Sequence, residues 1–470
     1  MERTYIKDVA AREGQEVMIR GWVDIRRDQG KLIFLDFRDM TGYVQGVILP
    51  GATEAHEVGS KVRPEWVVEV RGKVNKRPAK NVQADKQNGD IELEILGITV
   101  LNEAQTPPLD VRGEGTEIGE DVRLTYRYLD LRRPRLQKNI RNRGKVVKAI
   151  RDYLERENFV EIETPMLTRS TPEGSRDYVV PSRLEPGKFY ALPQSPQQYK
   201  QLLMVAGFER YFQIARCLRD EDSRADRQPE FTQMDLEMSF VEQADVMKLN
   251  EAMLIHIVQT LYPEKKISQI PFPHITYKEA MEKYGTDRPD IRTEAEKADP
   301  NVLAFCWVVD FPFFEKLEEK DGGGWTFTHN PFSAAKLEHR EWLMEGASGA
   351  HIGDILTTQY DVVLNGFEIG GGSIRNHNAE VFKKVFEIMG YSDEKIMSDF
   401  KHMFEAFGFG APPHGGIAWG VDRVIAILQN EASIREVIAF AKTGEGKDLM
   451  MNAPAEISPK QLKELGIKKG

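Results

Sequence analysis

Residues 208–240, FERYFQIARCLRDEDSRADRQPEFTQMDLEMSF, contain two extended runs separated by a densely charged segment. FERYFQIARCL and PEFTQMDLEMSF are both rich in aromatic and aliphatic residues, as strands are. The segment 219–227 between them alternates basic and acidic side chains, a pattern that is by itself typical of a solvated turn. The stretch therefore predicts two strands joined by a charged loop.

The segments around this pair alternate irregularly between helix and strand patterns. Apolar residues at helical spacing predict a helix over 135–157, and a strand-like segment follows at 159–164. Residues 360–373, YDVVLNGFEIGGGS, predict a strand that leads into glycines, and residues 416–429, GIAWGVDRVIAILQ, predict an apolar helix that opens with glycine. This order favours an α+β domain over 129–470, with an antiparallel sheet flanked by helices, rather than a βαβ repeat.

The first hundred residues have the pattern of a small all-β domain. Five β-rich runs, at 17–25, 31–37, 43–48, 66–74 and 90–101, are separated by turn signals. They predict a partly open five-stranded barrel of the OB type over 1–104, a fold that binds single-stranded nucleic acid. Its candidate contacts are Phe34, Arg26, Gln45 and Arg71; the alternative is that Phe34 and Phe37 are core and the others lie on the surface. Residues 105–128, with a Pro pair and several glycines, show no period and predict a hinge.

Composition excludes several classes of protein. The chain has 470 residues, a formal charge of −10 and only two cysteines, so it is neither a disulfide scaffold nor a zinc protein. It has no signal peptide and no run long enough to cross a bilayer, so we expect a cytoplasmic enzyme without a membrane partner. Residues 121–156 carry 12 basic and four acidic side chains, which allows either a solvated helix face or a contact with a phosphate backbone.

Several charged residues suggest a site for a polyphosphate. Arg423 lies at the start of the apolar helix, where the helix dipole favours an anion, so a bound phosphate would explain it. Glu368 and Arg375 flank three glycines, which would let a ligand approach the backbone. Asp361 and Glu368 would suit Mg²⁺ if a bulge brought both carboxylates together. His329 is a lone histidine, which by itself indicates a loop or core residue. Neither of the usual glycine-rich nucleotide loops occurs.

Taken together, these segments resemble a known family. Residues 157–178, 210–240 and 416–428 are similar to motifs 1, 2 and 3 of the class II aminoacyl-tRNA synthetases, in the right order behind an OB-type barrel. LPQSPQQYK at 192–200, FTQMD at 231–235 and NGFEIGGGSIR at 365–375 resemble signatures of the bacterial-type aspartyl enzymes. The resemblance implies that ATP activates L-aspartate, which then passes to the 3′-terminal adenosine of tRNA-Asp. A broader enzyme that also charges tRNA-Asn, an asparaginyl or lysyl relative and a non-catalytic protein are the alternatives.

The resemblance also implies a role for each matching residue. Arg219 and Arg423 match the catalytic arginines on the α- and γ-phosphates. The positions matching aspartate contacts are Glu173, Ser195, Gln197, Lys200, Arg219, Asp235, His329 and Arg375. Those matching ATP contacts are Arg219, Asp220, Glu221, Gln228, Glu368, Gly420, Val421, Asp422 and Arg423, and those matching Mg²⁺ ligands are Asp361 and Glu368. Arg26, Phe34, Gln45 and Glu92 match or adjoin anticodon contacts. Motif 1, with Pro165, implies a homodimer.

The chain departs from the family pattern in two places. Bacterial relatives carry an inserted domain between stretches similar to 284–290 and 306–312, where residues 291–304 are here too short to form one. Asn330 follows His329 where the family usually has a second histidine, which leaves no role for that histidine here. Because every other matched position is present, we predict that the shortening is tolerated.

Overall fold

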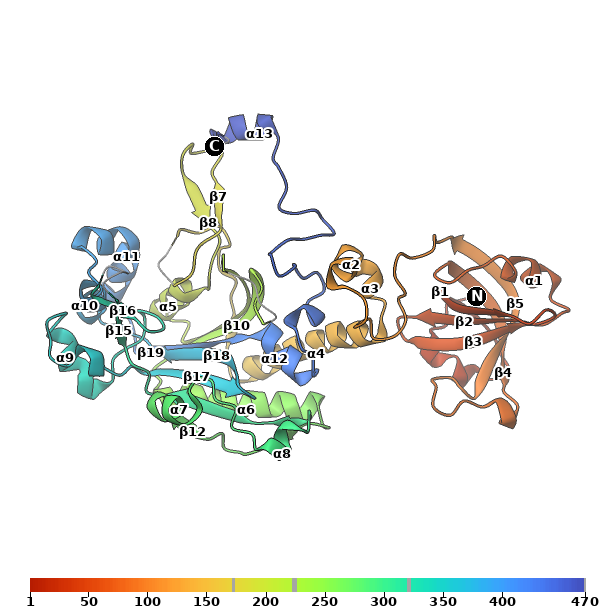
Figure 1. Cartoon of the computed structure of the whole chain (residues 1–470), viewed down its shortest axis with the longest axis horizontal. Helices are drawn as coiled ribbons and strands as arrows, with labels where there is room; N and C mark the ends of the chain where they lie inside the picture. Colours follow the sequence, from red (N-terminus) through yellow and green to blue (C-terminus); the bar gives the residue numbers. More distant parts are fainter. Residues whose placement is uncertain (171–173, 222–225, 319–322, 469–470) are drawn as a thin grey trace. The chain divides into compact units, whose positions relative to one another are not determined.

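The computed structural model describes residues 1–170, 174–221, 226–318 and 323–468, and it divides into two compact units, Met1–Gly113 and Glu114–Gly470 (Figure 1). The boundary falls within residues 105–128, where the sequence predicts a hinge; this stretch also contains helix α2 (Glu120–Thr125). Within the described ranges, no helix combines the length and apolarity needed to cross a membrane.

The first unit is a β-barrel, as predicted. Its strands are β1 (Glu16–Asp28), β2 (Ile33–Asp39), β3 (Gly42–Ile48), β4 (Val67–Lys76) and β5 (Ile91–Asn102), with α1 (Thr53–Gly59) between β3 and β4. Their order is β1-β2-β3-β5-β4, and the barrel is closed rather than partly open, because β3 and β5 pair in parallel and β1 pairs with β4. Phe37 lies in the core, whereas Phe34 is only half-buried, so the two phenylalanines have different environments.

The second unit is built on an eight-stranded sheet of the described residues (Figure 1). In spatial order its strands are β12 (His274–Thr276), β14 (Phe305–Val309), β17 (Gln359–Leu364), β18 (Phe367–Ile374), β19 (His414–Gly420), β10 (Glu230–Ser239), β9 (Arg210–Leu218) and β6 (Val160–Glu161). The predicted antiparallel sheet is confirmed for its six central strands. The edge pairs β12–β14 and β9–β6 are parallel, so the sheet is mixed.

Helices cover this sheet, and smaller elements surround it. The helices are α3 (Arg127–Asp130), α4 (Pro134–Arg156), α5 (Gln197–Val205), α6 (Gln243–Leu261), α7 (Tyr277–Tyr284), α8 (Glu294–Lys297), α9 (Arg340–Met344), α10 (Ala379–Ile388), α11 (Asp393–Gly408), α12 (Val421–Leu428) and α13 (Pro459–Leu465). The short strand pairs are β7–β8 (Val179–Pro181 and Phe189–Ala191), β11–β13 (Lys266–Ile267 and Val302–Leu303) and β15–β16 (Phe314–Lys316 and Trp325–Phe327).

The stretch 360–373 differs from its prediction as one strand leading into glycines. Asn365 and Gly366, both with positive φ, form a two-residue turn, so β17 and β18 are a hairpin and the glycines lie inside β18. Asn-Gly between apolar runs is a strong signal for such a turn. Similarly, the predicted strand 159–164 is reduced to Val160–Glu161.

Alternation along the strands separates the core from a polar face. Met234, Leu236 and Met238 of β10 pack into the main core with apolar residues of α4, α6 and α12. Because successive side chains of a strand point to opposite faces, Asp235 and Glu237 must project from the other face. The same rule applies to the neighbouring strands, so polar side chains of several strands share one surface.

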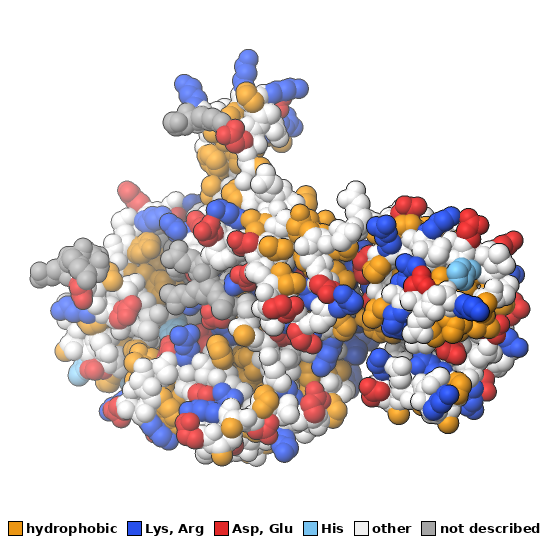
Figure 2. All heavy atoms as spheres, turned by 45° about the vertical axis from the view of Figure 1, so that its right-hand side comes forward, with side chains coloured by type: hydrophobic (Ala, Val, Ile, Leu, Met, Phe, Trp, Pro, Cys, Tyr) orange, Lys and Arg blue, Asp and Glu red, His pale blue; other side chains and the backbone are white. Residues whose placement is uncertain are grey.

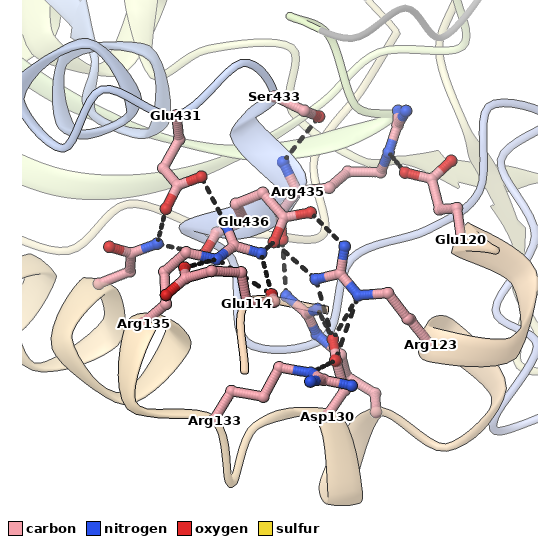
Figure 3. Close-up of polar contacts among 12 residues, drawn as sticks. Glu114, Glu120, Arg123, Asp130, Arg133, Arg135, Glu431, Ser433, Arg435 and Glu436 are labelled. Atoms are coloured by element: carbon pink, nitrogen blue, oxygen red, sulfur yellow. Dashed lines mark hydrogen bonds and ion pairs between the residues drawn. The ribbon is translucent and has the colours of Figure 1, made fainter. Parts of the chain in front are cut away.

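A buried network of ion pairs connects the start of the second unit to the segment after α12 (Figure 3). Asp130 accepts hydrogen bonds from Arg123 Nε, Arg127 Nη1 and Arg133 Nε, at 3.0, 2.8 and 2.7 Å. Arg123 and Arg135 both contact Glu436, which lies in the 3₁₀ turn Ile434–Glu436. Four of the 12 basic residues of 121–156 therefore belong to this network, a role different from both sequence interpretations.

The surface carries charges of both signs. Acidic and basic side chains are interspersed over the face shown in Figure 2, and hydrophobic side chains are scattered among them. Among the described residues of that face, no large area of one sign stands out. An intermixed surface agrees with the modest net charge and does not favour non-specific nucleic-acid binding.

Candidate active site

The polar face of the sheet contains two adjoining hollows. The first, of about 270 Å³, is lined by Ser195, Gln197, Lys200, Arg219, Gln233, Asp235, His329, Asn330, Phe332, Gln359, Glu368, Gly371, Gly372, Arg375 and Ala418. It includes every described residue that the sequence assigned to aspartate. Glu173 lies outside the described residues.

Four buried charged side chains form a cluster at one end of this hollow; Lys200, Asp235 and Arg375 line it, and Glu237 lies behind them. Lys200 Nζ lies 2.9 Å from Asp235 Oδ2 and 3.2 Å from Glu237 Oε2. Arg375 holds the same Glu237 with two hydrogen bonds, from Nε (2.9 Å) and Nη2 (3.1 Å). All four residues are at most 3% exposed. The two cations are therefore balanced by two carboxylates, so this end of the hollow carries no net positive charge.

Counting donors shows what this cluster still offers. A lysine has three N–H donors and an arginine has five. Lys200 donates one hydrogen bond to Asp235, and its ion pair with Glu237 takes up a second N–H at most. Arg375 uses four, because Ser373 Oγ and the Gly416 carbonyl also accept from it. Each cation therefore retains one N–H that these contacts do not occupy, and two such donors match the two oxygens of a carboxylate.

The pKa values in the cluster differ between its two carboxylates. Burial raises the pKa of Asp235 to about 6, although Lys200 opposes the shift. Burial also acts on Glu237, but the positive charges of Arg375 and Lys200 outweigh it and lower the pKa. Glu237 is thus firmly ionised at neutral pH and holds both cations in place, since it is the carboxylate that contacts both.

The second hollow, of about 240 Å³, contains most of the residues assigned to ATP. Its lining includes Arg219, Glu221, Gln228, Glu368, Gly420, Asp422 and Arg423, together with Asp226, Arg227, Phe231, Gln233, Ile369, Gly370, Ala418 and Ile434. Arg219, Gln233, Glu368 and Ala418 line both hollows, so the two adjoin. Two of the predicted ATP residues lie elsewhere. Asp220 faces Arg176 at 3.7 Å, and Val421 is buried in the core.

Two arginines of the second hollow have unused donors. Arg219 stacks on Phe231, with 5.1 Å from its guanidinium carbon to the ring centre. Arg423 donates to the Glu368 carbonyl and lies 3.3 Å from Asp226 Oδ2. The Nε atoms of both arginines are buried without a partner among the described residues. Since an unmade hydrogen bond of a buried charged group is costly, a bound anion fits this hollow.

Asp422, next to Arg423, has a structural contact that the sequence did not indicate. Its carboxylate accepts from the backbone N–H of Thr232 (2.9 Å) and from Arg143 of α4. These contacts fix the start of α12 against β10 and α4. They therefore help to hold Arg423 at the edge of the hollow.

Asp361 and Glu368 lie on the neighbouring strands of the hairpin. The pairing register shifts between Val362 and Val363, so a bulge of the kind that the sequence argument considered lies between the two residues. Burial, together with the negative charge of Glu368, raises the pKa of Asp361 well above its usual range. Two interacting carboxylates of this kind are stabilised by a cation, although only Glu368 lines the hollows.

Asn330 has a defined role in this arrangement. Its Nδ2 donates to Gln359 Oε1 (3.1 Å), and Gln359 Nε2 donates to Asp361 Oδ1 (2.8 Å). Asn330 thereby orients the Asp361 carboxylate through the side chain of Gln359. Its neighbour His329 lines the hollow edge-on to Phe311, and burial lowers the pKa of its imidazole.

The glycines of β18 serve mainly to bring strands together. A Cβ at Gly372 would lie 2.0 Å from the Gly416 carbonyl oxygen, and one at Gly370 would lie 2.7 Å from that of Ala418. Both contacts are with β19. Only Gly371 faces the carboxylate side, where a Cβ would lie 2.5 Å from Asp361 Oδ1. The sequence predicted that the glycines let a ligand approach the backbone. Gly371 and Gly372 do line the first hollow, but the main role of the glycines is the close approach of neighbouring strands.

The barrel has a hollow of its own, of about 600 Å³. Phe34, Gln45 and Glu92 line it, as the sequence anticipated. Arg26 does not, because it pairs with Asp28 at 2.6 Å; its neighbour Arg27 lines the hollow and holds Asp36 with two hydrogen bonds. Arg71 also lies outside the lining.

Sequence reasoning missed Glu237 and Arg27. Glu237 stands two residues after Asp235 on one strand, so alternation alone places both on the same face. Arg27 pairs directly with Phe34 across β1 and β2, a register that the sequence does not specify.

Comparisons with known proteins agree with this geometry. A family model described as "tRNA synthetases class II (D, K and N)" matches residues 119–444, and one described as "OB-fold nucleic acid binding domain" matches residues 17–101. The aspartate–tRNA ligase of Macrococcus caseolyticus is 39% identical, with 97% of this chain and 96% of that protein covered. The chain belongs to the aspartate–tRNA ligases of class II.

Other relatives of this synthetase extend the comparison. An "Aspartate--tRNA(Asp/Asn) ligase" of Caldanaerobacter subterraneus is 40% identical, with 98% and 96% covered. Asparaginyl-tRNA synthetase from Pyrococcus horikoshii shares the fold, with a TM-score of 0.74 at 21% identity over 98% of this chain and all of that one. The alignments with the ligases run over 577 to 585 positions, so those relatives carry more than 100 residues without a counterpart in this 470-residue chain.

Proposed function

We propose that this chain joins L-aspartate to tRNA-Asp with consumption of ATP. The observation that carries the proposal is the pair of unused donors, one on Lys200 and one on Arg375, at the buried end of the first hollow. The side-chain carboxylate of aspartate would accept from both. The amide of asparagine has only one acceptor oxygen and would bring its NH₂ group against a donor.

The selectivity can be tested by ATP–pyrophosphate exchange with aspartate, asparagine and lysine in parallel. We expect exchange with aspartate to exceed exchange with either of the others by about 1000-fold or more, because a buried donor left unpaired penalises the wrong substrate. Comparable exchange with asparagine would refute the assignment of the two donors.

Arg219 and Arg423 would hold the triphosphate during activation. The α-carboxylate of aspartate is ionised at neutral pH, so its oxygen attacks the α-phosphorus without a general base, and the bond to pyrophosphate breaks. Arg219 lines both hollows and would neutralise charge where the two substrates meet. Catalysis then consists of positioning and charge stabilisation.

Asp361 and Glu368 fit a magnesium ion that is shared with ATP. Among the described residues no group of three or more His, Cys, Asp or Glu could hold a metal, but Mg²⁺ commonly takes one or two carboxylates plus phosphate oxygens and water. The donor set supports a cation there, since the two carboxylates lie on neighbouring strands of one hairpin and Glu368 lines both hollows. When bound, the ion would neutralise phosphate charge.

The barrel hollow would bind the anticodon, with a base stacked on Phe34. In Phe34→Ala we expect the kcat/KM of tRNA charging to fall by about 5- to 150-fold, since stacking contributes about 1–3 kcal/mol per base. Aspartate-dependent pyrophosphate exchange should be unchanged. Tyr5→Ala serves as a control, because Tyr5 is an exposed aromatic residue outside the hollow. An equal loss of charging and exchange would contradict the division of labour.

A second candidate function is the charging of tRNA-Asn with aspartate in addition to tRNA-Asp. The name of the Caldanaerobacter relative is consistent with it but does not favour it over the first. Charging of purified tRNA-Asn by this enzyme would distinguish the two functions.

We further propose a homodimer that works in the cytoplasm. Val160 of the edge strand β6, and Met166 and Leu167 close after it, are exposed apolar residues. An edge strand beside such residues is suited to pairing with a second copy.

A further inference from the structure

Three hydrogen-bonded side chains, which we call the amide relay, lead from β19 to the first hollow. His414 lies at the start of β19, Gln201 lies in α5, and Gln197 lies one turn earlier in the same helix. His414 is 0% exposed and Gln201 is 1% exposed, whereas Gln197 is half-buried and lines the first hollow. Neither His414 nor Gln201 lines that hollow, so any effect of these two residues on the amino acid must pass through Gln197.

The direction of the hydrogen bonds is set at the end of the relay that is farthest from the hollow. The Pro412 carbonyl oxygen lies 2.7 Å from His414 Nδ1 and can only accept, so Nδ1 carries a proton. Burial lowers the pKa of His414, although the charge of Glu237 opposes the shift. The imidazole is therefore neutral at neutral pH, and its Nε2 has a lone pair but no hydrogen. Gln201 Nε2, 3.1 Å away, must donate to it.

The same direction passes from Gln201 to Gln197. Because the amide nitrogen of Gln201 is turned toward His414, its Oε1 is left to accept, and Gln197 Nε2 donates to it at 3.0 Å. The amide oxygen of Gln197 then lies on the side away from Gln201, and no donor among the described residues contacts it. A glutamine without such partners could present either its oxygen or its NH₂ group, since the two have nearly the same shape.

An acceptor at this place fits the amino group of the substrate. The α-ammonium group of aspartate has three N–H donors and no acceptor. The side-chain carboxylate of aspartate is assigned to Lys200 and Arg375, which line the same hollow as Gln197. An NH₂ group presented by Gln197 would place one donor against another. The orientation of this amide therefore affects how well the amino acid binds.

We propose that Gln201 and His414 are positioning residues that hold the Gln197 amide with its oxygen toward the ammonium group of the substrate. The inference deepens the proposed function and rests on it, because it concerns the binding of the same amino acid. An interaction that is present both before and during the reaction changes KM and leaves kcat unchanged. The amide relay should therefore act on the KM for aspartate.

Two substitutions of Gln201 separate hydrogen bonding from the filling of space. Gln201→Met has a similar length but cannot accept from Gln197, so the KM for aspartate in pyrophosphate exchange should rise by about 3- to 10-fold. Gln201→Glu keeps an oxygen for Gln197, and one proton shared between the carboxyl group and His414 Nε2 completes the other end. Its KM for aspartate should stay within twofold of the wild type. In both variants kcat and the KM for ATP should also stay within twofold, because neither Gln197 nor Gln201 lines the second hollow.

The outcomes that contradict the inference are distinct from those that contradict the proposed function. No rise in KM for Gln201→Met, or an equal rise for Gln201→Glu, would overturn the role of the amide relay. Absence of exchange with aspartate in the wild type would instead overturn the proposed function. Gln429→Met is the matched control and should leave the KM for aspartate unchanged. Gln429 Nε2 also donates one hydrogen bond, to Tyr262 Oη at 2.8 Å, but Gln429 lines neither hollow.

A double-mutant cycle tests whether Gln201 acts through Gln197. Gln197→Met removes the amide that the relay orients. Adding Gln201→Met to it should raise the KM for aspartate by less than about twofold, whereas the effects of independent residues would multiply. A further rise of about threefold or more would overturn the inference. His414→Phe keeps a ring of similar shape but removes the acceptor for Gln201, so it replaces Gln201→Met in both experiments if that variant does not fold.

Discussion

Arg375→Ala is expected to abolish aspartate activation while ATP still binds. Arg375 supplies one of the two donors assigned to the side-chain carboxylate and holds Glu237 with two hydrogen bonds. Loss of one partner of a buried, hydrogen-bonded charge pair costs about 2–5 kcal/mol, so kcat/KM for aspartate in pyrophosphate exchange should fall by about 30-fold or more. ATP binding should persist, because Arg375 does not line the nucleotide hollow.

Arg151→Ala is the matched control for this substitution. Arg151 also holds a glutamate, Glu161, through Nε and Nη2, but both side chains are largely solvent-accessible. An exposed pair of this kind contributes about 0–1 kcal/mol, so exchange should be unaffected. If Arg375→Ala retained exchange near the wild-type rate, the pocket would not bind aspartate in the way we describe.

Asp130→Ala should be among the most destabilising single substitutions in the chain. Asp130 is fully buried, and Arg123, Arg127 and Arg133 all donate to it. Removing it leaves buried guanidinium groups without their shared anion, which costs about 3–5 kcal/mol. Thermal or urea unfolding of the full chain would measure the loss.

The pH dependence of this stabilisation has a definite sign. Burial alone would raise the pKa of Asp130, but hydrogen bonds from Arg123 and Arg133 outweigh it and lower the pKa. A lowered pKa in the folded state stabilises the fold above the unfolded pKa of about 4, and the contribution is lost as the pH falls through the folded value. The difference between the wild type and Asp130→Ala should therefore be full at pH 7 and shrink in strong acid.

Asp152→Ala is the control for Asp130→Ala. Among the described residues the Asp152 carboxylate pairs with Lys148 alone, on an exposed face of α4. Its loss should change the free energy of unfolding by less than about 0.5 kcal/mol. Equal destabilisation by both substitutions would mean that the buried network contributes no more than a surface ion pair.

Most of the helices and strands could be predicted from the sequence, because the pattern of apolar and polar residues within a short segment indicates its secondary structure. The five runs of the barrel coincide closely with β1 to β5, and the helix predicted at 135–157 is α4. The hairpin at 359–374 differs from the predicted single strand, because the apolar residues on both sides of the Asn-Gly turn form one uninterrupted β-rich pattern, even though the turn is itself a local signal. The closure of the barrel depends on the parallel pairing of β3 with β5, which no local pattern specifies.

The cationic residues of the candidate site could be predicted from the sequence, because their residue types and the motifs around them indicate which groups they bind. Arg219, Lys200, Arg375 and Arg423 were identified through motifs that resemble those of a known family, and the structure brings them to two adjoining hollows. The charge balance at Lys200 and Arg375 was not predictable in this way. It depends on Glu237, whose contacts become visible only when β10 and β18 are placed on either side of β19.

Most strands and helices and all the kinds of charged group follow from the order of the amino acids, because alternation, helical spacing and residue type are properties of short segments. Which charges meet depends instead on the folded arrangement of the chain. Arg375 and Glu237 are 138 residues apart, and Arg123 and Glu436 are 313 residues apart. Contacts at such separations follow from strand order and helix packing, so the buried ion pairs and the two adjoining hollows could not be derived from the sequence alone.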